Sequence, residues 1–297
     1  MQYYRLADLD IAIDYENEFI EKRLEPFQRE PVEKVHMTIR INKAERIARL
    51  EGELLLDTGQ FLWTRRPGED GVTIHPAGAQ DESKNIYTLK ANPDWSCVDI
   101  NIRADHYVIS EGGEDTCADY CTPFLLCGIA FRNLLMHHEG LVIHSSSLAC
   151  NNKGILFTAP SGTGKSTHVR IWKWAYGDEV TIVNDDTPAV RFINGTPILF
   201  GTPWSGSPGV YSNTKVPLKA IVALERSSEN SIRKLNPLEA LPVLMKRSLL
   251  PYYDEKMMAV ACGLVERLME IVDFYKLGCR PDKEAAELAR SCVLADM

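Results

Sequence analysis

The strongest constraint on this chain is a glycine-containing run of nine residues, APSGTGKST, at positions 159–167. It follows the apolar run 155–157 and precedes a helix-compatible segment at 167–176. A loop between a strand and a helix is the context in which this pattern forms a phosphate-binding P-loop. Gly162 and Gly164 let the backbone N–H groups turn inward around an anion, and the helix N-terminus adds the positive end of its dipole. The sequence therefore predicts a phosphate site in a strand–loop–helix unit.

The side chains that follow these glycines suit a phosphate carrying magnesium. Lys165 can reach the outer phosphates, and the Ser166 hydroxyl can ligate Mg²⁺. The first motif position is Ala159, where the usual pattern has glycine, but the glycines nearest the phosphates are retained. We expect the phosphates to be held by Ser161, Gly162, Thr163, Gly164, Lys165, Ser166 and Thr167.

Two further features accompany the loop. Residues 141–149 fit a strand that carries His144, residues 151–154 a tight turn, and residues 155–158 the return strand of a hairpin. About twenty residues after Ser166, an apolar strand ends in the pair Asp185-Asp186. The hairpin histidine, the P-loop and the paired aspartates together resemble HPr kinase/phosphorylase and the related carboxykinase-type nucleotide fold. The motifs of this resemblance cover about residues 141–224.

The resemblance implies an α/β fold, with a P-loop core made of a mixed β-sheet and flanking helices, and it implies ATP and Mg²⁺ as cofactors. It also implies Asp186 as the catalytic base, His144 as the group that assists it near the transferred phosphoryl, and Lys165 as a third catalytic residue. Asp185 would bind the metal together with Ser166. Successive strand residues point in opposite directions, so the two aspartates fit a division of labour, although their spacing does not say which is the base.

Plainer interpretations of these residues stay open at this point. An Asp-Asp pair can simply cap a turn. A histidine on a half-buried strand can be a packed residue with a satisfied ring. A base beside a metal ligand nevertheless favours catalysis, because phosphoryl transfer needs a bound metal, charge neutralisation and a base near the acceptor hydroxyl.

We therefore expect an ATP- and Mg²⁺-dependent kinase that transfers the γ-phosphoryl group to a hydroxyl, with serine the foremost candidate, of a small protein, peptide or small molecule. The alternative is a nucleotide-binding regulatory or assembly module with little or no kinase activity. A phosphoenolpyruvate carboxykinase shares the resembled loop, but the chain lacks a second large domain with additional substrate-binding parts. The resemblance to HPr kinase also makes a homo-oligomer reasonable.

Residues 201–209, GTPWSGSPG, are rich in Gly, Pro and Ser and therefore predict a loop. The loop follows a predicted strand, and a turn at Asn194-Gly195 precedes that strand. It resembles the Gly-Thr-Pro-Trp segment of HPr-kinase-related proteins whose substrate is unknown. HPr kinase itself differs here, and its metal-side glutamate has no match in this chain. Trp204 fits a core aromatic and an acceptor-lining residue equally well. Lys215 or Arg226 could stabilise the transferring charge.

Composition limits the class of protein. The chain has 297 residues, 45% of them hydrophobic, and a formal charge of −8, which argues against general nucleic-acid binding because that requires a basic surface. No apolar run approaches the ~20 residues that span a bilayer, so we expect no membrane partner. The start lacks the basic region and apolar core of a signal peptide, which predicts a cytoplasmic location. The eight cysteines lack the spacing of zinc ligands and fit reduced thiols.

The pattern of the chain changes near residue 120. Before it, short alternating segments predict an antiparallel β-rich N-terminal domain, residues 1–121, with strands at 36–41, 52–56, 60–64, 71–75, 86–91 and 96–102. Residues 122–138 are apolar nearly all round and predict a buried helix. We expect this helix to open the P-loop catalytic core, residues 122–297, which ends in helices at 237–248, 254–270 and 282–294.

Overall fold

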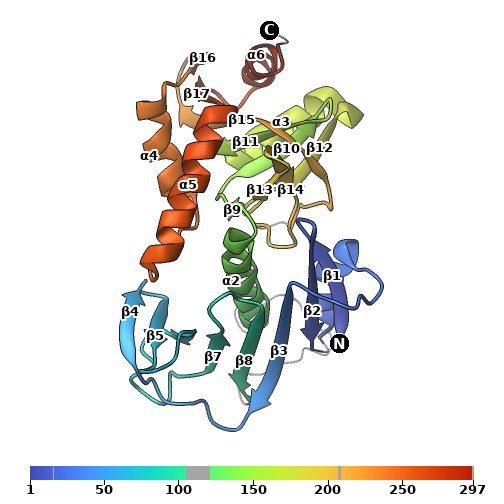
Figure 1. Ribbon diagram of the computed structural model, residues 1–297. Coiled ribbons are helices and arrows are strands. Elements are labelled where there is room, and N and C mark those ends of the chain that lie inside the picture. Colours follow the sequence, from blue (N-terminus) through green and yellow to red (C-terminus); the bar gives the residue numbers. More distant parts are fainter. Residues whose placement is uncertain (16, 105–120, 207–208, 296–297) are drawn as a thin grey trace. The chain divides into compact units, whose positions relative to one another are not determined.

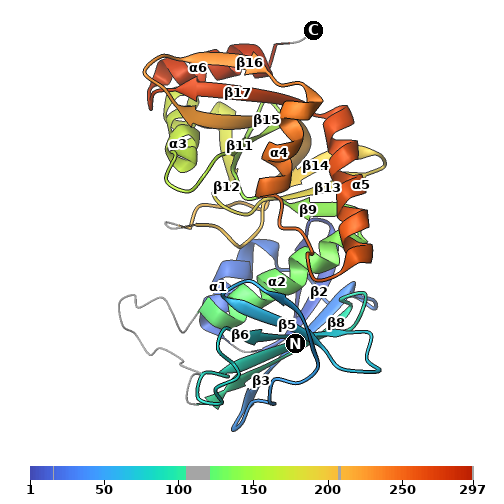
Figure 2. The same ribbon diagram turned by 90° about the vertical axis from the view of Figure 1, so that its left-hand side faces the viewer.

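The computed structural model describes residues 1–15, 17–104, 121–206 and 209–295. The chain divides into two compact units, each with its own β-sheet (Figures 1 and 2). Unit 1 consists of Met1–His137 and Pro251–Lys256, and unit 2 consists of His138–Leu250 and Met257–Met297. The expected boundary after residue 121 adjoins residues 105–120, which lie outside the described residues. The observed division comes later in the chain, after the predicted helix.

Unit 1 is built on an eight-stranded sheet with the order β1-β2-β3-β8-β7-β6-β5-β4. Its strands are β1 (Gln2–Leu6), β2 (Leu9–Asp14), β3 (Met37–Ala44), β4 (Glu53–Asp57), β5 (Phe61–Arg65), β6 (Val72–Pro76), β7 (Tyr87–Ala91) and β8 (Cys97–Arg103). Its helices are α1 (Glu18–Leu24), the 3₁₀ helix η1 (Glu25–Phe27) and α2 (Cys121–His137). All six strands predicted for this part of the chain are present.

The prediction that this sheet is antiparallel was wrong, because β3 runs parallel to both of its neighbours, β2 and β8. The chain from β2 to β3 passes through α1 and η1, and a connection of this length allows a crossover that a tight turn does not. The strands from β4 to β8 do form an antiparallel meander. Sequence patterns also missed the hairpin of β1 and β2, whose turn residues Ala7 and Asp8 have positive φ.

The helix α2 packs with unit 1, where it lies against β3 and β8. A buried polar and aromatic cluster ties it to the later segment Pro251–Lys256. The ring of Tyr253 stacks on Trp63 with centroids 4.3 Å apart. Its hydroxyl accepts a hydrogen bond from Trp95 Nε1 at 3.1 Å and donates to Asn133 Oδ1 at 3.0 Å. These contacts explain why a short segment from late in the chain belongs to unit 1.

Unit 2 contains a nine-stranded mixed sheet with the order β12-β10-β11-β15-β14-β13-β9, and β17 pairs with β15 and β16. The strands are β9 (Gly140–Val142), β10 (Ser146–Cys150), β11 (Lys153–Thr158), β12 (Val180–Asn184), β13 (Ala189–Ile193), β14 (Thr196–Phe200), β15 (Lys215–Arg226), β16 (Ser231–Lys234) and β17 (Asp273–Cys279). The helices are α3 (Lys165–Tyr176), η3 (Gly177–Glu179), α4 (Pro237–Arg247), α5 (Glu255–Ile271) and α6 (Lys283–Val293). The mixed sheet with flanking helices is the architecture that the sequence predicted.

The core of unit 2 lies between the central strands and the helices α3 and α6. Phe157 of β11 packs on Trp172 of α3, and Ala286 and Ala289 of α6 complete the same buried cluster. The small residues let α6 approach closely, because each alanine adds only one methyl group to the packed surface. This core fixes the position of β11 relative to α3, and therefore the two ends of the loop that joins them.

One predicted strand of unit 2 is interrupted. Residues 141–149 form two strands instead of one, because β9 pairs with β13 while β10 pairs with β11 and β12. At the break, the N–H groups of Ile143, His144 and Ser145 donate to the carbonyl oxygens of Pro188, Arg247 and Asp186, at 3.3, 2.7 and 2.9 Å. The backbone around His144 is therefore held by two segments, the turn at residues 186–188 and the C-terminal end of α4.

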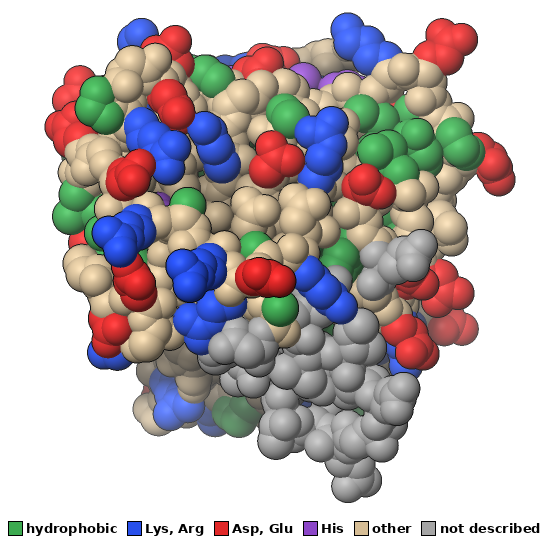
Figure 3. Space-filling model, turned by 90° about the horizontal axis from the view of Figure 1, so that it is seen from below, with side chains coloured by type: hydrophobic (Ala, Val, Ile, Leu, Met, Phe, Trp, Pro, Cys, Tyr) green, Lys and Arg blue, Asp and Glu red, His purple; other side chains and the backbone are tan. Residues whose placement is uncertain are grey.

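Charged side chains of both signs are mixed on the surface. On the face shown in Figure 3, Lys and Arg side chains are interspersed with Asp and Glu, so neither sign forms a continuous strip there. Among the helices in the described part of the chain, none is long and apolar enough to cross a membrane.

Candidate functional site

The loop 159–164 joins a strand to a helix, as the sequence predicted. The strand β11 ends at Thr158, and α3 begins at Lys165. Gly162 and Gly164 have φ angles of 75° and 118°. A Cβ atom would meet nothing within 4 Å at either position, so glycine is favoured there by backbone conformation and not by lack of space. The first N–H groups of α3 lack acceptors within the helix, which suits this end to an anion.

Lys165, the first residue of α3, has an ammonium group drawn inward to the loop. Its Nζ lies 3.2 Å from the carbonyl oxygen of Ala159 and 3.2 Å from Nε2 of His144. Only 8% of the residue is exposed. Burial, and next the positive charge of Arg247, lower the pKa of Lys165 below its ordinary value, and Asp186 and Asp185 partly offset this.

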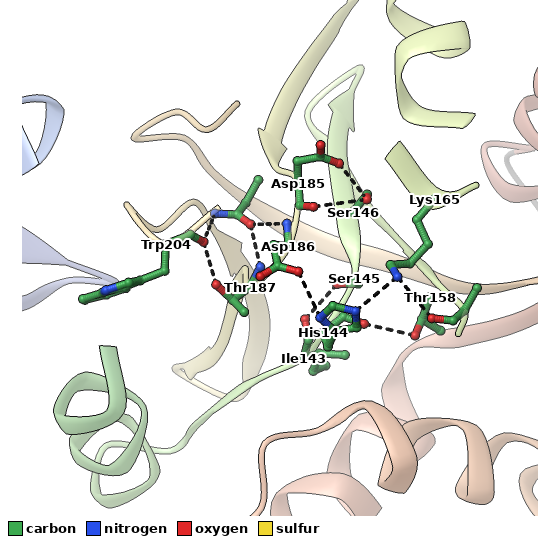
Figure 4. Close-up of polar contacts among 12 residues, drawn as sticks. Ile143, His144, Ser145, Ser146, Thr158, Lys165, Asp185, Asp186, Thr187 and Trp204 are labelled. Atoms are coloured by element: carbon green, nitrogen blue, oxygen red, sulfur yellow. Dashed lines mark hydrogen bonds and ion pairs between the residues drawn. The ribbon is translucent and has the colours of Figure 1, made fainter. Parts of the chain in front are cut away.

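His144 connects Lys165 to Asp186 (Figure 4). Its Nδ1 lies 3.1 Å from Oδ1 of Asp186, and its Nε2 faces the Lys165 ammonium group. The network assigns the ring proton to Nδ1, which then donates to the carboxylate, while Nε2 accepts from the lysine. The three side chains therefore form one line of polar contacts beside the loop, and they are three residues that sequence reasoning had selected.

Asp185 faces a different set of partners. Its Oδ1 accepts a hydrogen bond from Ser146 Oγ at 2.8 Å, and its Oδ2 lies 3.8 Å from the guanidinium of Arg170. Its side chain is 4% exposed, compared with 36% for Asp186. The two carboxylates thus have different partners and do not converge on one atom.

The turn that carries both aspartates begins at Asn184, the last residue of β12. Its side chain accepts hydrogen bonds from the N–H groups of Asp186 and Thr187, and it donates to the carbonyl oxygens of Thr202 and Trp204. The Thr187 hydroxyl donates to the same Trp204 oxygen at 2.6 Å, as Figure 4 shows. The segment Thr202–Trp204 is therefore fixed to the aspartate turn.

A pocket of about 610 Å³ opens beside the loop. It is lined by Thr158, Ala159, Pro160, Ser161, Gly162, Thr163, Ala223, Leu224, Glu225, Arg226, Pro242, Val243, Lys246, Arg247 and Lys276. Arg226 Nη2 donates to the carbonyl oxygen of Gly162 at 2.6 Å, and Lys276 pairs with Glu225 at 2.7 Å. Within the described residues, no carboxylate forms an ion pair with Lys246 or Arg247. The wall opposite the loop is therefore positively charged.

Sequence reasoning missed several of these residues. Asn184, Ser146 and Arg170 act through contacts with distant backbone or side-chain atoms, for which no local pattern exists. Lys246 and Arg247 end α4, where basic residues are common because they complement the helix dipole. Their sequence position therefore carried no signal of a pocket.

Other predicted residues are less closely assembled. Ser161 and Thr167 are exposed, and Thr163 and Ser166 are partly buried. Within the described residues, no hydrogen bond joins the Ser166 hydroxyl to Asp185, and no three His, Cys, Asp or Glu side chains converge as a metal cluster. Lys215 begins β15 and is absent from the pocket lining.

Comparisons with known proteins find little. Protein-family models and curated proteins give no match. Among solved structures, the chain is similar to the HPr(Ser) kinase/phosphatase from Coxiella burnetii, with 13% identity and a TM-score of 0.29. The match covers 52% of this chain and 96% of that chain. A likeness at this score is distant and says nothing about individual residues.

Proposed function

We propose that this chain is an ATP- and Mg²⁺-dependent kinase that transfers the γ-phosphoryl group to a hydroxyl. The observation that carries the proposal is the line of contacts from Lys165 through His144 to Asp186 beside a glycine loop. A phosphate held by the loop and by α3 would adjoin a cation, and the same network holds a partly exposed carboxylate. The positive wall of the pocket adds Lys246 and Arg247, which suit the remaining charge of a nucleotide.

The proposed reaction assigns one role to each member of this line. Asp186 accepts the proton of the acceptor hydroxyl while the hydroxyl oxygen attacks the γ-phosphorus. The bond between the γ-phosphorus and the bridging oxygen breaks, and ADP leaves with the electron pair. Lys165 neutralises charge on the phosphates. The Nδ1–H of His144 donates to the Asp186 carboxylate and orients it toward the acceptor side.

The oxygen donors of Asp185 and Ser166 are of the chemical type that a magnesium ion binds. Mg²⁺ in nucleotide enzymes uses one or two carboxylate or hydroxyl oxygens together with substrate phosphates and water, and does not need a cluster of three protein carboxylates. Asp185 and Ser166 would hold it, since both offer oxygen atoms from segments that adjoin the loop. When bound, the ion supplies charge neutralisation to the phosphates.

The alternative function is a nucleotide-binding regulatory or assembly module with little or no kinase activity. Such a module would also use the loop, but it would not need a partly exposed carboxylate oriented by a histidine. The contact between His144 and Asp186 therefore favours the kinase.

The test combines binding with transfer. We expect wild-type protein to bind Mg·ADP in calorimetry and, with Mg·ATP, to phosphorylate members of a Ser- and Thr-containing peptide library, or small alcohols, as detected by mass spectrometry. Lys165→Ala should weaken nucleotide binding about 10-fold or more, because it removes a charge-assisted contact to phosphate. Lys283→Ala changes an exposed lysine of the same unit and should have no effect.

Each outcome has a distinct meaning. Binding with transfer supports the kinase. Binding without transfer to any acceptor, and with ATP turnover that ignores Asp186, points to the regulatory module. If neither Mg·ADP nor Mg·ATP binds, the nucleotide assignment is wrong.

A further inference from the structure

The side chain of Asn184 forms hydrogen bonds through both ends of its amide group. The residue is fully buried, with 0% exposure, and it ends β12 immediately before the two aspartates. A buried amide must have its hydrogen bonds met, because an unpaired polar group in the interior destabilises the folded state. In this residue both ends of the amide are satisfied, and each end serves a different segment.

The oxygen end organises the aspartate turn. Oδ1 accepts the N–H of Asp186 at 2.8 Å and the N–H of Thr187 at 2.7 Å. An asparagine that bonds the backbone two residues ahead closes a local turn. The Asp186 carbonyl oxygen is held in addition by the N–H of Ser145 at 2.9 Å. The backbone that carries the proposed base is thus fixed on both sides.

The nitrogen end holds the Thr202–Trp204 segment. Nδ2 lies 2.9 Å from the carbonyl oxygen of Thr202, 3.1 Å from its hydroxyl and 2.9 Å from the carbonyl oxygen of Trp204. The Thr202 hydroxyl returns a bond to the carbonyl oxygen of Thr187 at 2.8 Å. The Trp204 carbonyl oxygen therefore receives bonds from Asn184 and Thr187, and its position is set by the aspartate turn.

The pattern of donors and acceptors specifies asparagine. Two N–H groups face one end of the side chain and two carbonyl oxygens face the other, so the orientation of the amide is unambiguous. Aspartate would bring a buried carboxylate against the two carbonyl oxygens, and alanine would remove the acceptor of the two N–H groups and one donor from each carbonyl oxygen. The backbone is also closely packed at Gly201, immediately before the Thr202–Trp204 segment, because a Cβ there would lie 1.8 Å from the carbonyl oxygen of Ser212.

We infer that Asn184 is a positioning residue that holds the Thr202–Trp204 segment in a fixed position relative to Asp186. The inference rests on the proposed function and extends it by assigning this segment as one wall of the acceptor side. An acceptor that rests against the wall is held at a constant distance from the Asp186 carboxylate. Displacement of a reacting group by about 1 Å can cost on the order of 100-fold in rate.

The test uses three variants of the full chain. Asn184→Ala removes both ends of the link. Asn184→Asp keeps an oxygen for the N–H groups of Asp186 and Thr187 but loses the donors to the segment. Ser147→Ala is the matched control, because within the described part of the chain its buried hydroxyl bonds the backbone carbonyl of Asn184 alone, at 3.0 Å. Thermal unfolding, Mg·ADP affinity, phosphoryl transfer from Mg·ATP to an acceptor that the wild type phosphorylates, and hydrogen exchange by mass spectrometry are measured for each.

Hydrogen exchange tests the link itself and does not depend on activity. In Asn184→Ala, amide exchange should rise both at residues 186–187 and in the segment 201–206. In Asn184→Asp, it should rise mainly in 201–206. Ser147→Ala should leave both segments protected, even where its melting temperature falls by a similar amount. An exchange increase at 186–187 that leaves 201–206 unchanged in Asn184→Ala would overturn the inference.

Kinetics tests the role in the reaction. The turnover number of Asn184→Ala for phosphoryl transfer to the acceptor should fall about 10-fold or more. Its Mg·ADP affinity should stay within about 2-fold of wild type, because the loop and Lys165 are untouched. A loss no larger than in Ser147→Ala at equal stability would reduce Asn184 to a structural residue. If the wild type fails to bind nucleotide, the proposed kinase is wrong while the exchange pattern still decides whether Asn184 links the two segments.

Discussion

The Nδ1 atom of His144 lies 3.1 Å from Oδ1 of Asp186. The contact is formed by a histidine at a break between two strands and an aspartate that follows a third, so it depends on the sheet order and not on sequence proximity. Backbone bonds hold both partners, since the N–H of His144 donates to Arg247 and the Asp186 carbonyl oxygen accepts from Ser145. A carboxylate held in this way is oriented before any substrate arrives, which is what a general base requires.

The two aspartates should separate when each is changed to asparagine. Asp186→Asn should keep Mg·ADP affinity and lower phosphoryl transfer by about 10² to 10⁴, the usual contribution of a general base. Asp185→Asn should raise the Mg²⁺ concentration needed for half-maximal turnover. Titration of activity with Mg²⁺ at saturating ATP distinguishes the two effects.

An exposed aspartate of the same unit provides the control for these changes. Asp178→Asn removes an equal charge from η3 and should behave as wild type. The assignment of roles is reversed if Asp186→Asn transfers normally while Asp185→Asn is inactive at every Mg²⁺ concentration.

Arg226 should matter through the shape of the loop. Its guanidinium bonds the carbonyl oxygens of Gly162 and Thr163 at 2.6 and 3.4 Å, which leaves the N–H groups of the loop available to an anion. Arg226→Gln should weaken Mg·ADP binding about 3- to 10-fold, as expected for loss of an ordinary, solvent-exposed hydrogen bond. Calorimetry checks this, with Arg280→Gln as a control on an exposed arginine of the same unit. Equal affinity in both variants would mean that the loop keeps its shape without Arg226.

Features set by local pattern could be predicted from the sequence. The glycines of the loop, the Asn194-Gly195 turn between β13 and β14, and the Asp282 cap of α6 each depend on residues within a few positions. Asp282, for example, accepts the N–H of Ala285 at 2.9 Å. The strand before the aspartate pair was also predicted, because an apolar run followed by polar residues is a strong signal of a strand end.

Features set by distant partners could not be predicted. At the break in the predicted strand 141–149, two distant segments, residues 186–188 and the end of α4, supply acceptors for its N–H groups, and alternation within the strand contains no sign of them. The parallel pairing of β3 with β2 depends on the crossover through α1, which the strand pattern does not contain. Asn184 looked like an ordinary strand-end residue, although its five bonds connect two segments of the candidate site.

As the pH rises, the affinity for Mg·ADP should begin to fall at a lower pH than at a site whose lysine has an ordinary pKa. Burial and then Arg247 lower the pKa of Lys165, so as pH rises this ammonium loses its proton, and its attraction for phosphate, earlier than a solvated lysine would. Calorimetry of Mg·ADP from about pH 7 to 10 measures the onset of the fall. Arg247→Gln removes the second cause and should move the onset to higher pH, whatever it does to affinity near pH 7. An unchanged onset would show that the charge of Arg247 does not reach Lys165.

Acid should destabilise the protein partly through His168, three residues after Lys165 on α3. The ring is buried, with 3% exposure, accepts the Trp172 Nε1–H at 3.1 Å and packs edge-on to Phe157. Its Nδ1 atom, also buried, has no hydrogen-bond partner among the residues that the structure describes. Burial lowers the pKa of His168 to about 4 from 6.5.

The sign of the effect follows from proton binding. The unfolded chain takes up a proton at His168 below about pH 6.5, whereas the folded protein does so only near pH 4, so the stabilising contribution is complete above pH 6.5 and is lost as pH falls toward 4. The shift corresponds to about 3 kcal/mol over this range. His168→Phe should be less stable at pH 8, because Trp172 loses its acceptor, but its free energy of unfolding in urea should fall less steeply between pH 6.5 and 4 than that of wild type. Parallel pH profiles for the two proteins would mean that His168 is protonated in the folded state as readily as in the unfolded chain.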